Sequence, residues 1–309
     1  MPSIRSFGRY LPDRVLTNIE LAGKLGCKPE WIYEVSGIEE RRVAGEQSVA
    51  ALAVKAGQDC LDRGGVSAQS VGLVMVSSAS AEQRFPGPAA VVAKELGRAG
   101  IPALDVPVAS AGSVFALVMA SQLTAVYGPV LVIAAEKMSV PAQREPLNKN
   151  VAILFGDGAG ACLVDPTDTG LQIRNHALHS DGNFAEDLKL DLEGTVKMNG
   201  LTVIMQASRK LPSAIAEVLS AAAIEPSAVS MFLMHQANQN LIDRVARAIG
   251  VPSSRFYTNI HRYGNTSSAS MLIAASEWHD QHPLASGDLV CFAAFGAGFH
   301  WGAVLAGQI

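Results

Sequence analysis

The chain has 309 residues, of which 49% are hydrophobic and 17% are charged. It is therefore long enough to bury a substantial core as one large domain or two ordinary ones. Its formal net charge of −4 and the lack of a polybasic block argue against nucleic acid or an anionic membrane as a partner.

The first residues, MPSIRSFGRYLP, have no apolar signal core, and no run of about 18 apolar residues occurs anywhere. We therefore expect a cytoplasmic protein that is neither secreted nor membrane-spanning. A helical stretch at 49–65 then leads to an apolar run, VGLVMVSSAS at 71–80, which predicts a buried strand. A turn of small residues opens an apolar helix at 109–127, and strands are predicted at 129–136 and 160–165.

The second half of the chain repeats this order of elements. A helix, a strand, a second helix opened by small residues and two further strands are predicted at 211–226, 229–238, 264–278, 288–298 and 301–307. Such a duplication implies two mixed sheets with helices on their outer faces and a helical layer between them. The alternative is one doubly wound domain with accidental similarity. The turn-rich segment DPTDTG places the boundary between halves 1–166 and 167–309.

The duplication also predicts where a site would lie. The N-termini of the two central helices, at Ser110 and near Asn265, should face each other and share one pocket, and His235 ends a strand beside them. Free N–H groups at helix N-termini favour a developing oxyanion or a nucleophile that must lose a proton. Taken singly, each residue has a simpler explanation: an N-cap for Ser110, a packed side chain for His235 and a turn for Asn265.

Other motifs are weaker. GDGAGA at 156–161 fits a dinucleotide fingerprint, but apolar residues on both sides suggest that it joins two strands and opens no helix. His176 and His179 form HxxH without a third ligand, so we expect no metal site. The four cysteines form no CxxC pair, and small hydrophobic packing in a reducing cytoplasm explains them: Cys27, Cys60, Cys162 and Cys291.

Several motifs together resemble the 3-oxoacyl-[acyl-carrier-protein] synthase III family. SAGSVFAL, GDGAGA, HQAN, GNTS and GAGFHWGA occur in that family's order and spacing, and the N-terminal segments WIYEVSGIEERR (31–42) and RFPGPAA (84–90) resemble it too. The resemblance implies a thiolase-like fold of five α-β-α-β-α layers and a decarboxylating Claisen condensation. In that reaction an acyl group from coenzyme A is loaded on a nucleophile and attacked by a carbanion from malonyl-carrier protein.

The resemblance also assigns roles by position. Ser110 matches the nucleophile, which is cysteine in the family, and His235 and Asn265 match the pair that stabilises the enolate. The backbone N–H groups of Ser110 and Ala297 match a second oxyanion hole. Phe85 resembles a residue that crosses a homodimer interface to limit the acyl pocket. Substrate contacts fall on Trp31, as a platform for adenine, and on Lys149, Ile204, Asn238 and Phe295. No permanently bound cofactor is implied; acyl-coenzyme A and malonyl-carrier protein are substrates.

The chain departs from the family at three positions. A serine hydroxyl is far harder to ionise than a cysteine thiol, so Ser110 would need a general base, and His235 is the matched candidate. The arginine expected four residues after Trp31 is Val35, and the one expected after HQAN is Asn240. These losses weaken the case for a coenzyme A donor and for standard carrier-protein docking, and they favour a specialised secondary pathway.

Three explanations of Ser110 stay open: a natural serine-dependent acyltransferase or priming ketosynthase, an engineered replacement of cysteine, and an enzyme that decarboxylates without being acylated. Two other functions also stay open. One is acyl transfer from Ser110 to an alcohol or amine. The other is a non-acylating partner subunit of a heterodimeric synthase.

Overall fold

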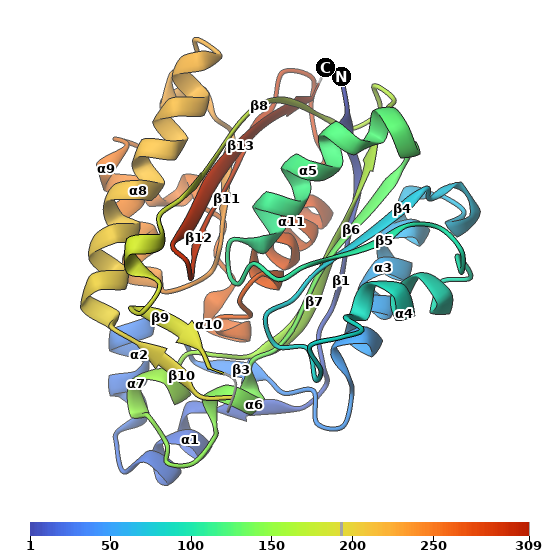
Figure 1. Cartoon of the computed structure of the whole chain (residues 1–309). Coiled ribbons are helices and arrows are strands. Elements are labelled where there is room, and N and C mark those ends of the chain that lie inside the picture. The colour runs from blue at the N-terminus through green and yellow to red at the C-terminus, as the bar shows by residue number, and fades with distance from the viewer. Residues whose placement is uncertain (192–193, 309) are drawn as a thin grey trace.

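The computed structural model describes residues 1–191 and 194–308. Its strands form two groups that flank a pair of central helices, and further helices cover the outer faces (Figure 1). The N-terminal group contains β1 (Ser3–Tyr10), β4 (Leu73–Ser77), β5 (Ala103–Val106), β6 (Val130–Lys137) and β7 (Asp157–Asp165). The C-terminal group contains β8 (Leu171–Ser180), β11 (Met231–Met234), β12 (Leu289–Gly296) and β13 (His300–Gln308).

The helices fill three layers. The central layer is α5 (Gly112–Tyr127) and α11 (Ala269–Gln281); the outer layers are α3 (Val49–Gly64) with α4 (Pro88–Glu95), and α8 (Gly200–Ala221) with α9 (Gln239–Ala248). The remaining elements surround one end: α1 (Asn18–Leu25), α2 (Pro29–Ser36), α6 (Ser139–Ala142), α7 (Lys149–Ala152), α10 (Ile260–Tyr263), β2 (Val15–Thr17), β3 (Glu40–Arg42), β9 (Leu188–Leu190) and β10 (Val196–Met198). The predicted five-layered α/β architecture is confirmed.

Strand pairing follows one pattern in both halves. β4 runs parallel to β6, and β6 and β1 are each antiparallel to β7. In the same way β11 runs parallel to β12, and β12 and β8 are each antiparallel to β13. β5 adds one parallel strand beside β4. The two strand groups were expected to be separate sheets, but a short pairing of Ser3 with Gln172 and Ile4 with Leu171 joins β1 to β8, giving one nine-stranded sheet.

The central helices are buried nearly all round because both strand groups cover them. α5 contacts β4, β6 and β7 on one side and β12 and β13 on the other, and α11 likewise contacts strands of both halves. Most of their residues up to the last turn are apolar or small on every face, which is typical of a helix enclosed in a core. The outer helix α3, by contrast, buries only one stripe, including Val49, Leu52 and Ala56.

The glycines of GDGAGA explain how α11 packs so closely on the sheet. The segment from Asp157 onward lies within β7, and the short helix α7 precedes it, so the expectation that it joins two strands was wrong. A Cβ atom at Gly160 would lie 2.7 Å from the backbone nitrogen of Ile273 and 2.7 Å from Cβ of Leu272. Glycine is needed here for close backbone approach, which accounts for the motif without any nucleotide.

Within the described ranges, no helix is both long and apolar enough to cross a membrane.

Candidate active site

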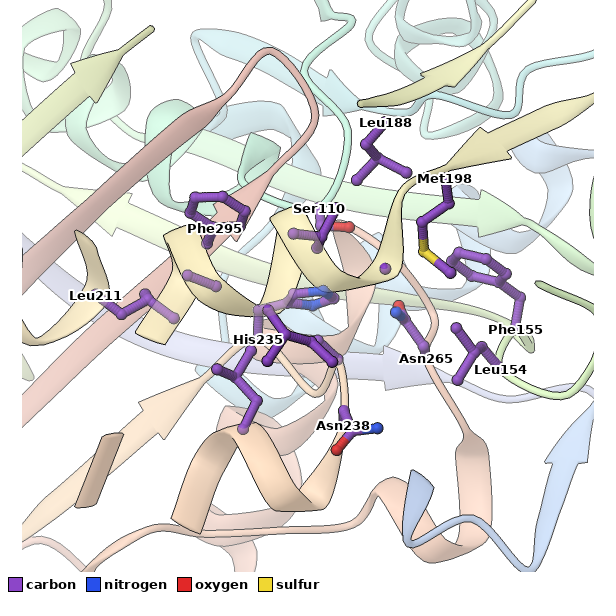
Figure 2. A pocket seen from close by; sticks show the side chains of 16 residues that line it. Ser110, Leu154, Phe155, Leu188, Met198, Leu211, His235, Asn238, Asn265 and Phe295 are labelled. Carbon is purple, nitrogen blue, oxygen red and sulfur yellow. The ribbon is translucent and has the colours of Figure 1, made fainter. Parts of the chain in front are cut away.

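One pocket collects polar residues from both halves of the chain. Ser110, His235 and Asn265 line a cavity of about 100 Å³ (Figure 2). Its other walls are mostly apolar and include Leu154, Phe155, Leu188, Met198, Val203, Ile204, Leu211, Leu241 and Phe295. The cavity therefore brings together the three residues that the duplication placed in one pocket, in surroundings that strengthen electrostatic interactions.

Ser110 lies in the tight turn that leads into α5. Its side chain is buried, and within the described part of the chain its hydroxyl has no hydrogen-bond partner, so it is free to meet a ligand. The end of β12 packs against this turn: a Cβ atom at Gly296 would lie 2.7 Å from the nitrogen of Ala111 and 3.0 Å from that of Ser110. Ala297, the next residue, lines a larger depression shared with Val108 and Ala109 on the other side of the turn.

His235 directly follows β11 and is held from two sides. Its backbone N–H donates to the carbonyl of Ala293 at 2.9 Å, and its Nδ1 lies 2.6 Å from Oγ of Ser270. Burial lowers the pKa of the imidazole to about 3, and a hydrogen bond with the backbone of Ser267 opposes this only in part. The ring is therefore neutral near pH 7 and carries one N–H.

Asn265 is fixed through both its backbone and its side chain. Its N–H donates to the carbonyl of Leu154 at 2.9 Å, and its carbonyl accepts from the N–H of Gly156 at 3.1 Å. Its side-chain Oδ1 accepts from the N–H of Ser267 at 2.9 Å. Because a backbone N–H can only donate, the amide oxygen must face Ser267, and the NH₂ group is left as a donor in the pocket.

Ser267 adopts a left-handed backbone conformation with φ of 47°. This is unusual for a residue other than glycine and costs about 1–3 kcal/mol. It allows the N–H of Ser267 to reach Oδ1 of Asn265. The strain therefore lies at the residue that orients a pocket side chain.

A buried carboxylate that the sequence analysis missed supports the start of α11. Glu136 is the penultimate residue of β6 and accepts hydrogen bonds from the hydroxyl of Ser268 at 2.6 Å, the N–H of Ala79 at 3.1 Å and the hydroxyl of Ser80. Burial raises the pKa of this carboxyl, although these donors oppose the rise. The only sequence signal was one acidic residue at the end of the apolar run PVLVIAAE.

Arg41 is a second buried support without a sequence signal of its own. Its guanidinium donates to the carbonyl of Ile153 at 2.7 Å and to the side chain of Asn18 at 2.8 Å. Ile153 adjoins Leu154, the backbone partner of Asn265. Arg41 thus anchors the segment against which Asn265 is held.

The structure places several predicted substrate contacts outside the pocket. Nζ of Lys149 lies 4.1 Å from the ring centre of Trp31, and neither residue lines the cavity. Phe85 is 85% exposed and also lies apart from it. By contrast, Ile204, Asn238 and Phe295 do line the cavity.

The two positions that lack the expected arginines lie against each other. The amide of Asn240 donates to the backbone carbonyls of Glu34 and Val35 at 3.3 and 3.4 Å, and that of Asn238 donates to Val35 at 2.8 Å. These bonds tie the start of α9 to the end of α2. Asn240 therefore has a structural role where a positive charge is missing.

None of the four cysteines lines the cavity. Cys60, Cys162 and Cys291 are buried, and burial raises the pKa of Cys60 and of Cys291 to about 12. These thiols remain protonated and cannot replace a cysteine at position 110.

Of the motif HxxH, His179 stacks on Trp301 and its Nε2 lies 2.7 Å from Oε2 of Glu217. Among the described residues no group of three or more His, Cys, Asp or Glu side chains could hold a metal ion.

The chain is similar to known proteins over nearly its whole length. Residues 104–182 match the family model described as 3-oxoacyl-[acyl-carrier-protein (ACP)] synthase III, and residues 219–307 match the model of its C-terminal part. The beta-ketoacyl-[acyl-carrier-protein] synthase III of Aquifex aeolicus is 34% identical over 300 residues, which is 96% of each chain. That of Geobacillus kaustophilus is 33% identical, again over 96% of each chain.

Solved structures show the same similarity. The crystal structure of 3-oxoacyl-[acyl-carrier-protein] synthase III from Aquifex aeolicus superposes with a TM-score of 0.95 at 34% identity, covering 99% of this chain and 100% of the other. The priming beta-ketosynthase of the R1128 polyketide pathway superposes with a TM-score of 0.92 at 27% identity, covering 100% and 97%.

The low pKa of His235 predicts how stability changes with pH. Because the folded-state pKa lies below the ordinary value of about 6.5, protonation favours the unfolded chain. The contribution of the neutral imidazole is fully present above pH 6.5 and is lost as the pH falls toward 3. Between pH 7.5 and 4.5 the wild type should lose about 3 kcal/mol more free energy of unfolding than His235→Asn, as measured by urea unfolding. His176→Asn, at an exposed histidine, is the matched control; parallel curves for wild type and His235→Asn would contradict the prediction.

Proposed function

The chain belongs to the 3-oxoacyl-[acyl-carrier-protein] synthase III family, and from this membership and the pocket we propose that it catalyses a decarboxylating Claisen condensation. An acyl primer, carried by coenzyme A or a carrier protein, would be joined to malonyl-carrier protein to give a 3-oxoacyl-carrier protein. The observation that carries the proposal is the convergence of a neutral histidine and an amide donor, His235 and Asn265, beside Ser110 in one apolar cavity.

His235 and Asn265 would act on the malonyl thioester. Its carbonyl oxygen would lie between an N–H of the imidazole and the NH₂ group of Asn265. When carbon dioxide leaves, the electron pair of the broken C–C bond moves into an enolate, and both donors stabilise the charge on its oxygen. A neutral imidazole suits this step because its N–H donates a hydrogen bond to the enolate oxygen without transferring its proton. The apolar walls, such as Phe155 and Leu241, strengthen both hydrogen bonds by excluding water.

Ser110 would be the site of acyl loading, at the position that the family resemblance matches to a nucleophilic cysteine. Its Oγ would attack the primer thioester, and the backbone N–H groups of Ser110 and Ala297 would bind the resulting oxyanion. The hydroxyl proton must go to a base, and His235 is the candidate in the pocket. A base with a pKa of about 3 accepts a proton poorly, so we infer that loading is slow beside decarboxylation. The same observation favours, as a second candidate, an enzyme that decarboxylates malonyl thioesters without being acylated.

The primer's carrier would bind outside the cavity. Trp31 offers an aromatic face and Lys149 one positive charge, which together suit the adenine and a phosphate of coenzyme A. Val35 and Asn240 supply no further charge, so we propose weak binding of coenzyme A and a carrier-protein interface adapted to a specialised pathway. The protein would work in the cytoplasm without a permanently bound cofactor.

Decarboxylation tests the proposed role of the donor pair. Ser110→Ala should still convert malonyl-carrier protein to acetyl-carrier protein, because it keeps both donors. His235→Ala and Asn265→Ala should each slow this conversion by about 10²–10³-fold, the usual effect of losing one oxyanion donor. Mass spectrometry of the carrier protein measures it, with His176→Ala as the control. Malonyl-carrier protein that stays intact during long incubation with the wild type would refute the proposal.

Acyl loading tests Ser110 directly. Intact-protein mass spectrometry after incubation with acyl-coenzyme A and acyl-carrier-protein donors should show an acyl adduct on the wild type, and none on Ser110→Ala. Ser110→Cys should load faster, because a thiol at a helix N-terminus ionises near neutral pH. Loading of Ser110→Cys alone would mean that the serine is a disabled nucleophile and would favour the second candidate.

We also propose a homodimer formed through the free edge of β5. Among the described strands β5 pairs with β4 alone, and Leu104 on β5 and Phe85 are 44% and 85% exposed. An unpaired edge strand with exposed apolar residues invites pairing with a second copy.

Leu104→Lys should convert the dimer to a monomer, because it places a charge at that edge. Ile19→Lys, at a more exposed apolar residue on α1, should leave the dimer intact. Size-exclusion chromatography with light scattering distinguishes the two. A wild type that is monomeric at high concentration, or a Leu104→Lys variant that remains dimeric, would exclude this interface.

A further inference from the structure

Ser270, the second residue of α11, lies behind His235 and outside the cavity lining. Its buried Oγ accepts a hydrogen bond from the backbone N–H of Gln236 at 3.0 Å. The same oxygen lies 2.6 Å from Nδ1 of His235 and 3.0 Å from the carbonyl oxygen of Ser267. Because the N–H of Gln236 can only donate, the single hydroxyl proton has two possible acceptors: the ring nitrogen and the carbonyl.

The choice of acceptor decides which nitrogen of His235 carries the ring proton. If the hydroxyl donates to Nδ1, the ring proton must be on Nε2, which then meets the pocket as a donor. If the hydroxyl turns to the carbonyl of Ser267, Nδ1 must hold the proton and donate to Ser270 or to the backbone of Ser267, with which the ring also forms a hydrogen bond. Nε2 then meets the pocket as an acceptor. A histidine's second nitrogen commonly fixes its tautomer in this way.

We propose that Ser270 is a positioning residue that sets the tautomer of His235, and that its hydroxyl holds the Nε2–H form required to stabilise an enolate. The shorter of its two contacts is the one to Nδ1. The inference rests on the proposed function, because only a thioester oxygen in the pocket makes the donor tautomer useful.

The other orientation of the hydroxyl would serve acyl loading. With the proton on Nδ1, Nε2 can accept the proton of the Ser110 hydroxyl while Oγ forms its bond to the thioester carbon. It can then return that proton to the thiolate that leaves. Conversion of the Nδ1–H tautomer to the Nε2–H tautomer adds one proton at Nε2 and removes one at Nδ1. Proton exchange with water can supply and accept these protons, so the ring stays neutral. Rotation of the Ser270 hydroxyl would thus switch His235 between the tautomer that serves decarboxylation and the tautomer that serves acyl loading.

Nitrogen NMR of the histidine rings tests the tautomer independently of catalysis. Protein labelled with ¹⁵N-histidine gives distinct shifts for protonated and bare ring nitrogens, and the spectrum of His235→Asn identifies the signals of His235 among the seven histidines. The wild type should show Nε2–H. Ser270→Ala should show Nδ1–H, because the Ser267 carbonyl is then the acceptor left beside Nδ1. Ser270→Cys, which keeps the volume but donates weakly, gives a second reading should the alanine variant not fold.

Activity should change in parallel with the tautomer. Ser270→Ala should slow malonyl decarboxylation at least tenfold while retaining acyl loading on Ser110, a split that a general loss of structure would not produce. Ser276→Ala is the matched control. Ser276 is a buried serine of the same helix, and its hydroxyl accepts a hydrogen bond from Arg9 and makes none with His235. Unchanged ¹⁵N shifts of His235 in Ser270→Ala would overturn the inference. A wild type without decarboxylase activity would instead refute the proposed function and leave the NMR result valid.

Discussion

The pocket depends on the close packing of α5 and α11 between the strands of the two halves. This contact brings two buried helix N-termini together. It is possible only where glycine, which has no side chain, allows close approach. A Cβ atom at Gly112 would lie 1.9 Å from Oγ of Ser77, and one at Gly296 would touch the turn that holds Ser110. Glycines at these positions therefore determine how near Ser110, His235 and Asn265 can come to one another.

Close packing of helix N-termini also buries polar groups that must find partners. Glu136 is the partner of several of these groups. Its carboxylate accepts hydrogen bonds from the N–H and hydroxyl of Ser268 at the start of α11, and from the N–H of Ala79 in the loop after β4. It therefore links the N-terminal half to the helix that carries the C-terminal part of the site. A buried carboxylate without such donors would be costly, so the network is integral to the packing.

The sequence predicted the order of the elements and the shared pocket, because a duplicated pattern of helices and strands carries positional information. It located Ser110, His235 and Asn265 by the same logic. It could not reveal Glu136, Arg41 or Ser270, whose roles depend on which side chains meet across more than 30 residues of chain. Nor could it show that GDGAGA lies within β7 from Asp157 onward. It also could not show that β1 and β8 join the strand groups, because a two-residue pairing leaves no periodic signal.

With serine at position 110, a neighbouring group would have to accept the proton of the nucleophile. A cysteine at a helix N-terminus can lose its proton to solvent before substrate arrives, so the neighbouring histidine can remain a donor throughout. In the proposed mechanism a serine must lose its proton during attack, and the candidate base in the cavity is His235, whose burial favours the neutral imidazole. The apolar burial that would make His235 a good donor to the proposed enolate would thus make it a poor base for Ser110. One environment cannot serve both proposed steps equally, and the burial of His235 suits the proposed decarboxylation better than acyl loading.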